Sequence, residues 1–163
     1  MKIGIIGHTG LLGSALYNEF SKDHEVVGMS RATGHDLRKN AQTIINECKT
    51  CDLVFNNAHA DTTQGKLIMG LADTEVKLIT SGSMAADFNW NRYCNEKKIV
   101  ESIFKKFKPK YPNRCLLLKV GYLEGHAQEG QGVIPIPISM IVDSVKFWLD
   151  NTRITVMEFD NIK

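Results

Sequence analysis

The sequence predicts a doubly wound α/β fold built on a parallel sheet, and three observations support this class. Short apolar runs alternate along the chain with amphipathic segments of helical period, as in a parallel sheet covered on both faces. A glycine-rich turn at residues 7–13 joins the first apolar run to the first amphipathic segment. The chain has 163 residues and no linker, repeat or low-complexity tract, so we expect one domain over residues 1–163.

Three strands are predicted in the first half of the chain, where short runs are mainly apolar: residues 2–6, 24–28 and 52–55. Each strand is followed by a segment whose apolar residues recur at helical spacing: residues 11–20, 40–48 and 65–71. In the first of these segments Leu12, Leu16 and Phe20 fall on one face, as expected for a helix that packs against a sheet.

The second half continues the alternation with strands at residues 76–80, 114–120 and 153–159 and helices at residues 92–107 and 139–149. The run Leu116-Leu117-Leu118 is continuously apolar, which is typical of a strand buried on both faces. The inner face of the longest helix is predicted to carry Ile99, Val100, Ile103, Phe104 and Phe107. The pattern therefore gives six strands in one parallel sheet.

Composition and charge exclude several functional classes. The 20 basic and 18 acidic residues leave a net charge of +2, which favours neither a nucleic-acid partner nor a membrane surface. The longest apolar stretch, residues 132–142, contains two prolines and is shorter than the roughly 20 residues that span a bilayer. The N-terminus does not read as a signal peptide, and we expect a cytoplasmic protein whose four cysteines are reduced.

The glycine turn has the spacing G-x-x-G-x-x-G, with Gly7, Gly10 and Gly13 between the first strand and the first helix. Glycine permits a tight turn there and lets a pyrophosphate approach bare backbone, while the helix N-terminus offers free N–H groups. We therefore predict a dinucleotide site, with a purely structural glycine turn as the alternative. The residues expected to hold the pyrophosphate are Gly7, Thr9, Gly10, Leu11, Leu12 and Gly13.

The end of the second strand predicts which dinucleotide binds. An acidic residue about 20 positions after the loop favours NAD, whereas an arginine there accommodates the 2′-phosphate of NADP. This chain has Ser30 and Arg31 at that point, and both can bond a phosphate. The predicted cofactor is NADP, but Asp36 keeps NAD possible, and a solvated loop charge is the alternative for Arg31.

Tyr93 and Lys97 form a Y-x-x-x-K pair at the start of the longest helix. The four-residue spacing puts both side chains on one helix face. An ammonium group beside a phenol favours its ionised form, so the pair could supply a proton donor or acceptor near neutral pH. An exposed helix pair without a chemical role is the alternative.

Two serines stand at the carboxyl end of the fourth strand, within the run Thr80-Ser81-Gly82-Ser83. Ligands of open α/β sheets bind at this edge, so a serine hydroxyl there could hydrogen-bond a substrate carbonyl oxygen. Ser81 is the first candidate, because it lies 12 residues before Tyr93, and Ser83 is the competing one. The sequence predicts no metal site, since Cys48-x-x-Cys51 has neither a second such pair nor suitably spaced histidines.

Taken together, these motifs resemble the short-chain dehydrogenase/reductase family over nearly the whole chain. The glycine spacing and the run from Tyr93 through Lys97 to Glu101 are closest to its extended, epimerase-like branch. Further positions resemble the family's cofactor contacts: Asp36 and Leu37 at adenine, Asn57 and Ala58 after the third strand, and Gly121 and Leu123 beside the nicotinamide amide. His59 stands where glycine is usual.

The resemblance implies a Rossmann-like fold and hydride transfer between a nicotinamide and a small carbonyl compound or its alcohol. Tyr93 would be the general acid/base, and Lys97 would hold the nicotinamide ribose and lower the pKa of Tyr93. Ser81 or Ser83 would polarise the carbonyl. The resemblance also implies a homo-oligomer, a dimer or tetramer.

We expect no separate substrate domain, which is a departure from the extended branch. The substrate pocket is then expected from residues 84–91 and from a glycine-rich, lid-like loop at residues 124–137. Two other functions stay open. One is an NAD-dependent nucleotide-sugar epimerase or dehydratase, and the other is an NADP-binding regulator without turnover.

Overall fold

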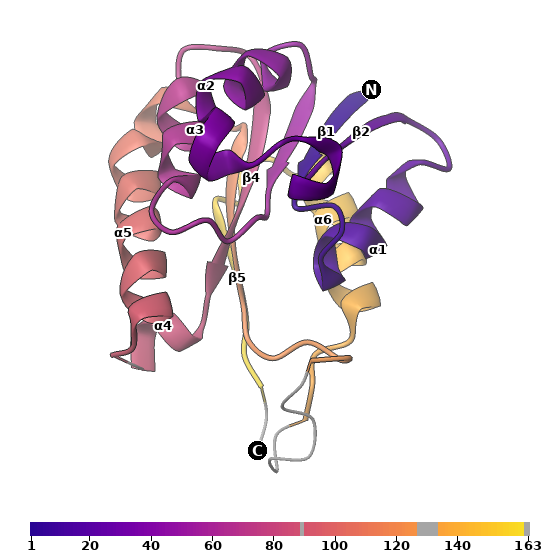
Figure 1. The fold of residues 1–163 in the computed structure, drawn as a ribbon. Helices are drawn as coiled ribbons and strands as arrows, with labels where there is room; N and C mark the ends of the chain where they lie inside the picture. The colour runs from indigo at the N-terminus through magenta and orange to yellow at the C-terminus, as the bar shows by residue number, and fades with distance from the viewer. Residues whose placement is uncertain (89, 127–133, 162–163) are drawn as a thin grey trace.

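A computed structural model of the chain describes residues 1–88, 90–126 and 134–161. Its centre is a sheet of six parallel strands in the order β2-β1-β3-β4-β5-β6 (Figure 1). The strands are β1 (Lys2–Ile6), β2 (Glu25–Met29), β3 (Leu53–Asn56), β4 (Lys77–Ser83), β5 (Cys115–Val120) and β6 (Val156–Phe159). This architecture confirms the predicted Rossmann-like α/β class.

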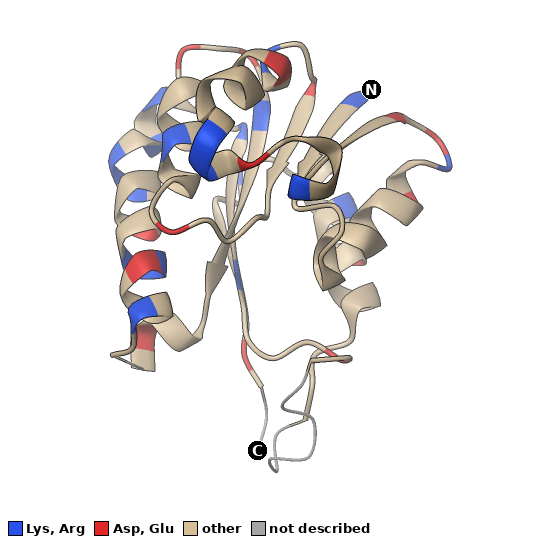
Figure 2. Ribbon diagram, viewed as in Figure 1, with Lys and Arg blue, Asp and Glu red and all other residues tan. Residues whose placement is uncertain are grey.

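Helices cover both faces of the sheet. The α-helices are α1 (Leu11–Phe20), α2 (Leu37–Cys48), α3 (Gln64–Gly70), α4 (Ala85–Phe88), α5 (Arg92–Phe107) and α6 (Ile138–Asp150). Figure 1 shows α2, α3 and α5 on one side of the strands and α1 with α6 on the other. Two short 3-10 helices, η1 (Arg31–Thr33) and η2 (Lys108–Lys110), complete the described elements. Figure 2 shows that α5 carries both basic and acidic residues.

The apolar core has two parts, one on each face of the sheet. Val54 and Leu78 point toward the α2, α3 and α5 layer, where Phe104 packs on them. Phe55 points to the opposite face, where Trp148 of α6 is fully buried. Alternate residues of one strand therefore enter different cores, which is why the central strands are apolar throughout.

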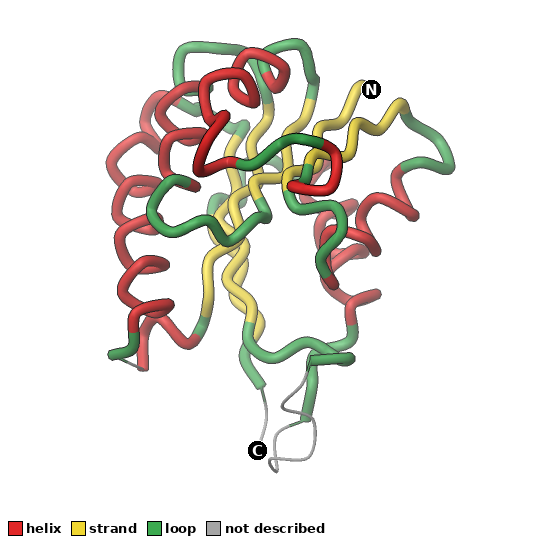
Figure 3. The backbone as a smooth tube through the Cα atoms, in the orientation of Figure 1, coloured by secondary structure: helices red, strands yellow, loops and turns green. Residues whose placement is uncertain are grey.

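The strand order reverses beside β1, because β2 lies on one side of β1 and β3 on the other. Ligands of doubly wound sheets bind at this point, outside the carboxyl ends of the strands. The loops that follow β1, β2, β3, β4 and β5 therefore gather near one edge of the sheet (Figure 3). Five of the predicted groups belong to these loops or strand ends: the glycine turn, the Ser30–Arg31 pair, the Asn57–Ala58 pair, the two serines of β4 and the segment from Gly121 to Leu123.

Some local predictions were wrong in ways that have a physical reason. β4 continues to Ser83, because residues 81–83 pair with β5 beyond the point where the apolar run ends. α2 begins at Leu37, three residues early, because Asp36 caps it, and its backbone is irregular at Asn40. Ile99 is 47% exposed, since it lies beside the buried stripe of α5 that contains Val100.

No helix among the described residues combines the length and the apolar character that crossing a bilayer requires.

Candidate active site

The turn between β1 and α1 is packed so closely that two of its glycines cannot carry a side chain. Gly7 has a φ of +83°, a conformation that side chains rarely tolerate, and its missing Cβ would lie 3.0 Å from the backbone of Ala58. A Cβ on Gly13 would lie only 2.1 Å from the carbonyl oxygen of Gly7. Gly10 is different, because its Cβ would make an ordinary 3.4 Å contact.

The N-terminus of α1 opens onto this turn without a capping side chain. Gly10 is the N-cap residue, no side chain caps the helix, and its first turn holds no acidic residue. Thr9, Gly10 and Leu11 are exposed, whereas Leu12 and Gly13 are buried beneath the turn. The first N–H groups of the helix and its positive dipole end therefore suit an anionic group.

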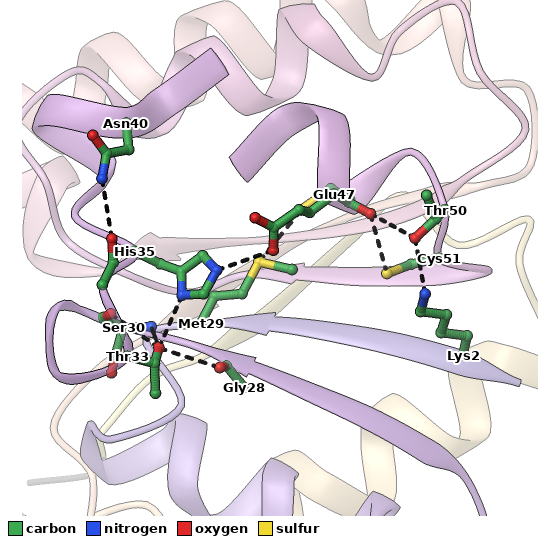
Figure 4. Close-up of polar contacts among 12 residues, drawn as sticks. Lys2, Gly28, Met29, Ser30, Thr33, His35, Asn40, Glu47, Thr50 and Cys51 are labelled. Atoms are coloured by element: carbon green, nitrogen blue, oxygen red, sulfur yellow. Dashed lines mark hydrogen bonds and ion pairs between the residues drawn. The ribbon is translucent and has the colours of Figure 1, made fainter. Parts of the chain in front are cut away.

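The loop after β2 begins with Ser30 and Arg31. Ser30 is buried and caps η1, and no described residue accepts a hydrogen bond from its hydroxyl group. Arg31 is exposed and begins η1. The loop is braced by Thr33, whose hydroxyl accepts the Ser30 N–H at 2.9 Å and bonds the His35 ring at 3.0 Å (Figure 4). A buried hydroxyl group whose O–H has no acceptor, beside an exposed arginine, fits a phosphate group.

Asp36 and Leu37 have structural roles where the resemblance implied adenine contacts. The carboxylate of Asp36 accepts the N–H of Arg38 at 3.1 Å and so caps α2. The Leu37 side chain is 3% exposed and packs in the core. His35 also supports this helix, because its ring lies 3.0 Å from the Glu47 carboxylate (Figure 4).

A cavity of about 650 Å³ lies at the carboxyl ends of β3, β4 and β5. Several predicted site residues line it: Leu12, Asn57, Ser81, Ser83, Tyr93, Lys97, Gly121 and Leu123. The predicted pocket segments contribute Met84, Ala85, Phe88, Asn91 and His126. The middle of the predicted lid, residues 127–133, lies outside the described residues. The cavity thus brings the Y-x-x-x-K pair and both serines together with Leu12 of α1, whereas the three glycines of the turn and the Ser30–Arg31 pair do not line it.

Tyr93 and Lys97 are held differently inside the cavity. The Tyr93 ring is 40% exposed and packs against the His59 ring, with 4.8 Å between their centres. Lys97 is 3% exposed, and its ammonium group lies 5.9 Å from the centre of the Tyr93 ring. That ammonium donates to the Gln64 side-chain oxygen at 3.0 Å and to the Ser81 carbonyl oxygen at 2.9 Å.

The expected lowering of the Tyr93 pKa by Lys97 is wrong for this structure. Burial raises the pKa of Tyr93, and a hydrogen bond with Ser83 lowers it by less. Burial also lowers the pKa of Lys97 to about 8, against a weaker opposing effect of Glu101. Two N–H groups of the lysine are directed to acceptors on α3 and β4, and Lys97 is not among the groups that shift the pKa of Tyr93.

The two serines have different surroundings. The Ser81 hydroxyl lies 3.4 Å from the carbonyl oxygens of Asn56 and Asn57 and accepts from the Gln64 amide at 3.2 Å. Ser83 is buried beside Tyr93, and its backbone N–H donates to the Glu101 carboxylate at 3.1 Å. Ser81 is therefore engaged with the chain, whereas the Ser83 side chain faces the phenol.

The segment after β5 offers only some of its backbone to a ligand. The Gly121 N–H donates to the Phe159 carbonyl at 2.9 Å, and the Tyr122 N–H donates to the Asn161 side chain at 2.6 Å. The Leu123 N–H has no acceptor among the described residues. Leu123 is thus the position at which this segment can still donate into the cavity.

Sequence reasoning missed Gln64 and Asn161, which help to organise the site, and it singled out His59 without finding its contacts. Gln64 touches Lys97 and Ser81, and Asn161 holds the backbone of Tyr122. His59 carries a pKa lowered by burial and by Lys97, and its ring lies 3.1 Å from Glu96. No periodicity identifies these residues, because their roles depend on contacts between segments that are distant in sequence.

Cys48 and Cys51 are free, buried thiols. Burial raises the pKa of Cys48 to about 12, which makes its thiol unreactive. Among the described residues, no three ligating side chains gather as a metal site would require.

No family model and no curated protein matches the chain. Solved structures do match it. A dTDP-4-dehydrorhamnose reductase from Clostridium acetobutylicum superposes with a TM-score of 0.74 at 16% identity, covering 98% of this chain and 74% of that one. A short-chain dehydrogenase from Burkholderia cenocepacia, in complex with NADP, gives a TM-score of 0.74 at 12% identity over 97% of this chain and 88% of that one.

The chain shares the fold of short-chain dehydrogenases. An alcohol dehydrogenase from Thermococcus sibiricus, complexed with 5-hydroxy-NADP, gives a TM-score of 0.69 at 11% identity. That match covers 98% of this chain and 96% of the alcohol dehydrogenase. The identities are low, so the likeness to this dehydrogenase fold concerns the backbone, and the function depends on the side chains of the site.

Proposed function

We propose that the chain is an NADP(H)-dependent oxidoreductase that interconverts a small carbonyl compound and its alcohol. The observation that carries this proposal is the cavity, which brings Tyr93, Lys97 and Ser83 together with Leu12, in the first turn of the helix that follows the glycine turn. Solved structures with this fold, crystallised with NADP, support the choice of cofactor.

The residues present fit NADP at three places. The bare backbone of Gly7 and Gly13 and the uncapped start of α1 suit the pyrophosphate. Ser30 and Arg31 would hold the 2′-phosphate, and the Leu123 N–H would hold the nicotinamide amide. When bound, the nicotinamide supplies or accepts the hydride.

In the reducing direction Tyr93 donates its phenolic proton to the carbonyl oxygen, so that hydride plus proton gives the alcohol. A phenol is protonated at neutral pH, so Tyr93 has a proton to donate, although burial raises its pKa and makes it a weaker acid than an exposed tyrosine. Ser83 donates a hydrogen bond to the same oxygen, because its side chain faces Tyr93. Lys97, with a pKa of about 8, is charged at pH 7 and binds the nicotinamide ribose.

The test is NADPH oxidation by the purified protein with a panel of small aldehydes and ketones. Tyr93→Phe is expected to lower kcat by about 10²- to 10⁴-fold without changing the Kd for NADPH. Tyr17→Phe is the matched control, since Tyr17 lies on α1 against His8 and does not line the cavity.

Two results would contradict the proposal. Equal turnover by Tyr93→Phe and the unmodified chain would remove Tyr93 as the acid. NADPH binding without turnover across the whole panel would favour a non-catalytic, NADP-binding regulator.

A further inference from the structure

Gln64 is a fully buried amide at the start of α3. Its side-chain N–H groups donate to the Asn56 carbonyl at 2.6 Å and to the Ser81 carbonyl at 3.2 Å. Its side-chain oxygen accepts from the Lys97 ammonium at 3.0 Å. The Asn56 side chain donates in return to the Gln64 backbone carbonyl at 3.0 Å. Because both ends of the amide have partners of the right kind, its orientation is fixed.

These contacts determine how the Lys97 ammonium is oriented. An ammonium group has three N–H donors. Two of them meet the Gln64 oxygen on α3 and the Ser81 carbonyl on β4. No described residue accepts the third, and Lys97 lines the cavity beside Tyr93, so that N–H is available to a bound molecule.

We propose that Gln64 is the positioning residue that fixes the direction and the charge state of Lys97. The proposal depends on the proposed function in one respect only, which is that the group bound by Lys97 is the nicotinamide ribose. Gln64 is suited to this role because its amide is neutral. It gives the ammonium a strong acceptor without adding a negative charge to a buried site.

Other groups that act on Lys97 lie on two elements. Glu101, on the same helix, raises its pKa, and the Tyr93 ring lies 5.9 Å from its ammonium. His59, after β3, is itself affected by the Lys97 charge. Substitution at residue 64 leaves these three groups in place, so a change in the Lys97 titration would report the Gln64 contact.

The experiment compares Gln64→Glu with Gln64→Met in the protein without cofactor. The Lys97 pKa is read from the pH dependence of its side-chain resonances in ¹³C,¹⁵N-lysine-labelled protein, with Lys97→Arg used to assign them. Gln64→Glu adds a negative charge and is expected to raise the midpoint by about one pH unit. Gln64→Met removes an acceptor of the charged form and is expected to lower it by about one pH unit.

Gln42→Glu is the matched control, because Gln42 is exposed on α2 and bonds only Asn46 among the residues that the structure describes. It should leave the Lys97 midpoint unchanged. A second measurement needs no variant at residue 64. In the unmodified chain, the Gln64 side-chain amide resonances should titrate with the same midpoint as Lys97. If the Gln64 side-chain amide shifts do not change with pH at the Lys97 midpoint, the proposal is overturned even if both variants fail to fold.

The same variants separate this proposal from the proposed function. If the Lys97 midpoint is the same in Gln64→Glu and Gln64→Met, or moves in the same direction in both, the proposed role of Gln64 is overturned. If the midpoints move apart as stated but the unmodified chain binds no NADPH, the Gln64–Lys97 coupling stands and the proposed function fails. If both hold, the alkaline limb of the activity profile should move up in Gln64→Glu and down in Gln64→Met.

Discussion

The glycine turn after β1 and the polar network between β3, β4 and α5 hold opposite ends of the same candidate site. The turn is contiguous, and its shape follows from backbone sterics at Gly7 and Gly13. The network joins Asn56, Gln64 and Lys97, which lie up to 41 positions apart. One region is built by leaving side chains out, and the other by burying polar side chains that satisfy one another.

This difference determines how each region responds to change. The tightly packed turn fails when a Cβ is added at Gly7 or Gly13, because the backbone atoms that it would meet, in Ala58 and in Gly7 itself, cannot move away cheaply. The network fails when one side chain is replaced by a group that cannot hydrogen-bond, because its former partners are then buried and unpaired. Sterics should dominate at the turn, and pH should dominate at the network.

The largest expected effect is at the turn. Gly13→Ala should lower the free energy of unfolding by about 3 kcal/mol or more and abolish NADPH binding, because its Cβ would lie 2.1 Å from the Gly7 oxygen. Gly10→Ala is the matched control, since its Cβ would lie at 3.4 Å, and it should cost less than about 1 kcal/mol. Chemical denaturation checks both. Equal stabilities would mean that the turn is not sterically determined.

The next effect is the pH dependence of stability at Lys97, which the glycine turn should not show. Unfolded lysine keeps its proton to about pH 10, whereas buried Lys97 loses its proton above about pH 8. Between these values the unfolded state binds more protons than the folded state. The free energy of unfolding should therefore rise with pH as Lys97 loses its proton. Between pH 8 and pH 10 the free energy of unfolding of the unmodified chain should rise by roughly 2 to 3 kcal/mol more than that of Lys97→Met.

Denaturation curves at several pH values check this gain. The control is Lys66→Met, which changes an exposed lysine of α3 and should give no such pH-dependent difference. A constant difference between the unmodified chain and Lys97→Met over this interval would show that Lys97 is not held with a lowered pKa.

A smaller effect concerns the phosphate end of the site. Arg31→Ala should weaken NADPH binding about tenfold and leave NADH binding unchanged, because only NADPH carries the 2′-phosphate. Arg153→Ala changes an exposed arginine before β6 and should alter neither affinity. Fluorescence titration with both nucleotides gives the comparison. Equal losses for NADPH and NADH would place Arg31 away from the 2′-phosphate.

The smallest effect separates Asp36 from cofactor choice. Asp36 caps α2, so Asp36→Ala should cost about 1 kcal/mol of stability. It should leave the ratio of NADPH to NADH affinities unchanged, since its carboxylate is directed at the helix. Thermal unfolding and the same two titrations measure both quantities. A change in that ratio larger than the one caused by Arg31→Ala would reverse the two assignments.

The periodicity of apolar residues and the glycines of the first turn were sufficient to predict the fold. The alternation of apolar runs and helical faces predicted all six strands, and the glycines placed the turn between β1 and α1. The predicted ends of the elements were less accurate where a polar segment is ordered by the strands that pair with it. β4 extends through Ser83 because β5 pairs with it, and hydropathy does not report that pairing.

The candidate site was predictable only in part. Y-x-x-x-K spacing brought Tyr93 and Lys97 into one cavity, because helix geometry fixes residues four positions apart. The direction of the Lys97 ammonium was not predictable, since it depends on Gln64, 33 positions away. The choice between Ser81 and Ser83 has the same origin, because both lie on one strand and differ only in what surrounds them.

The most direct test of the account is a paired titration of the unmodified chain with NADPH and NADH, followed by nicotinamide fluorescence. The account predicts saturable binding of both nucleotides, with NADPH bound more tightly. Failure of both nucleotides to bind would contradict it, because the glycine turn would then be structural and the cavity would lack the hydride carrier that the proposed reaction requires.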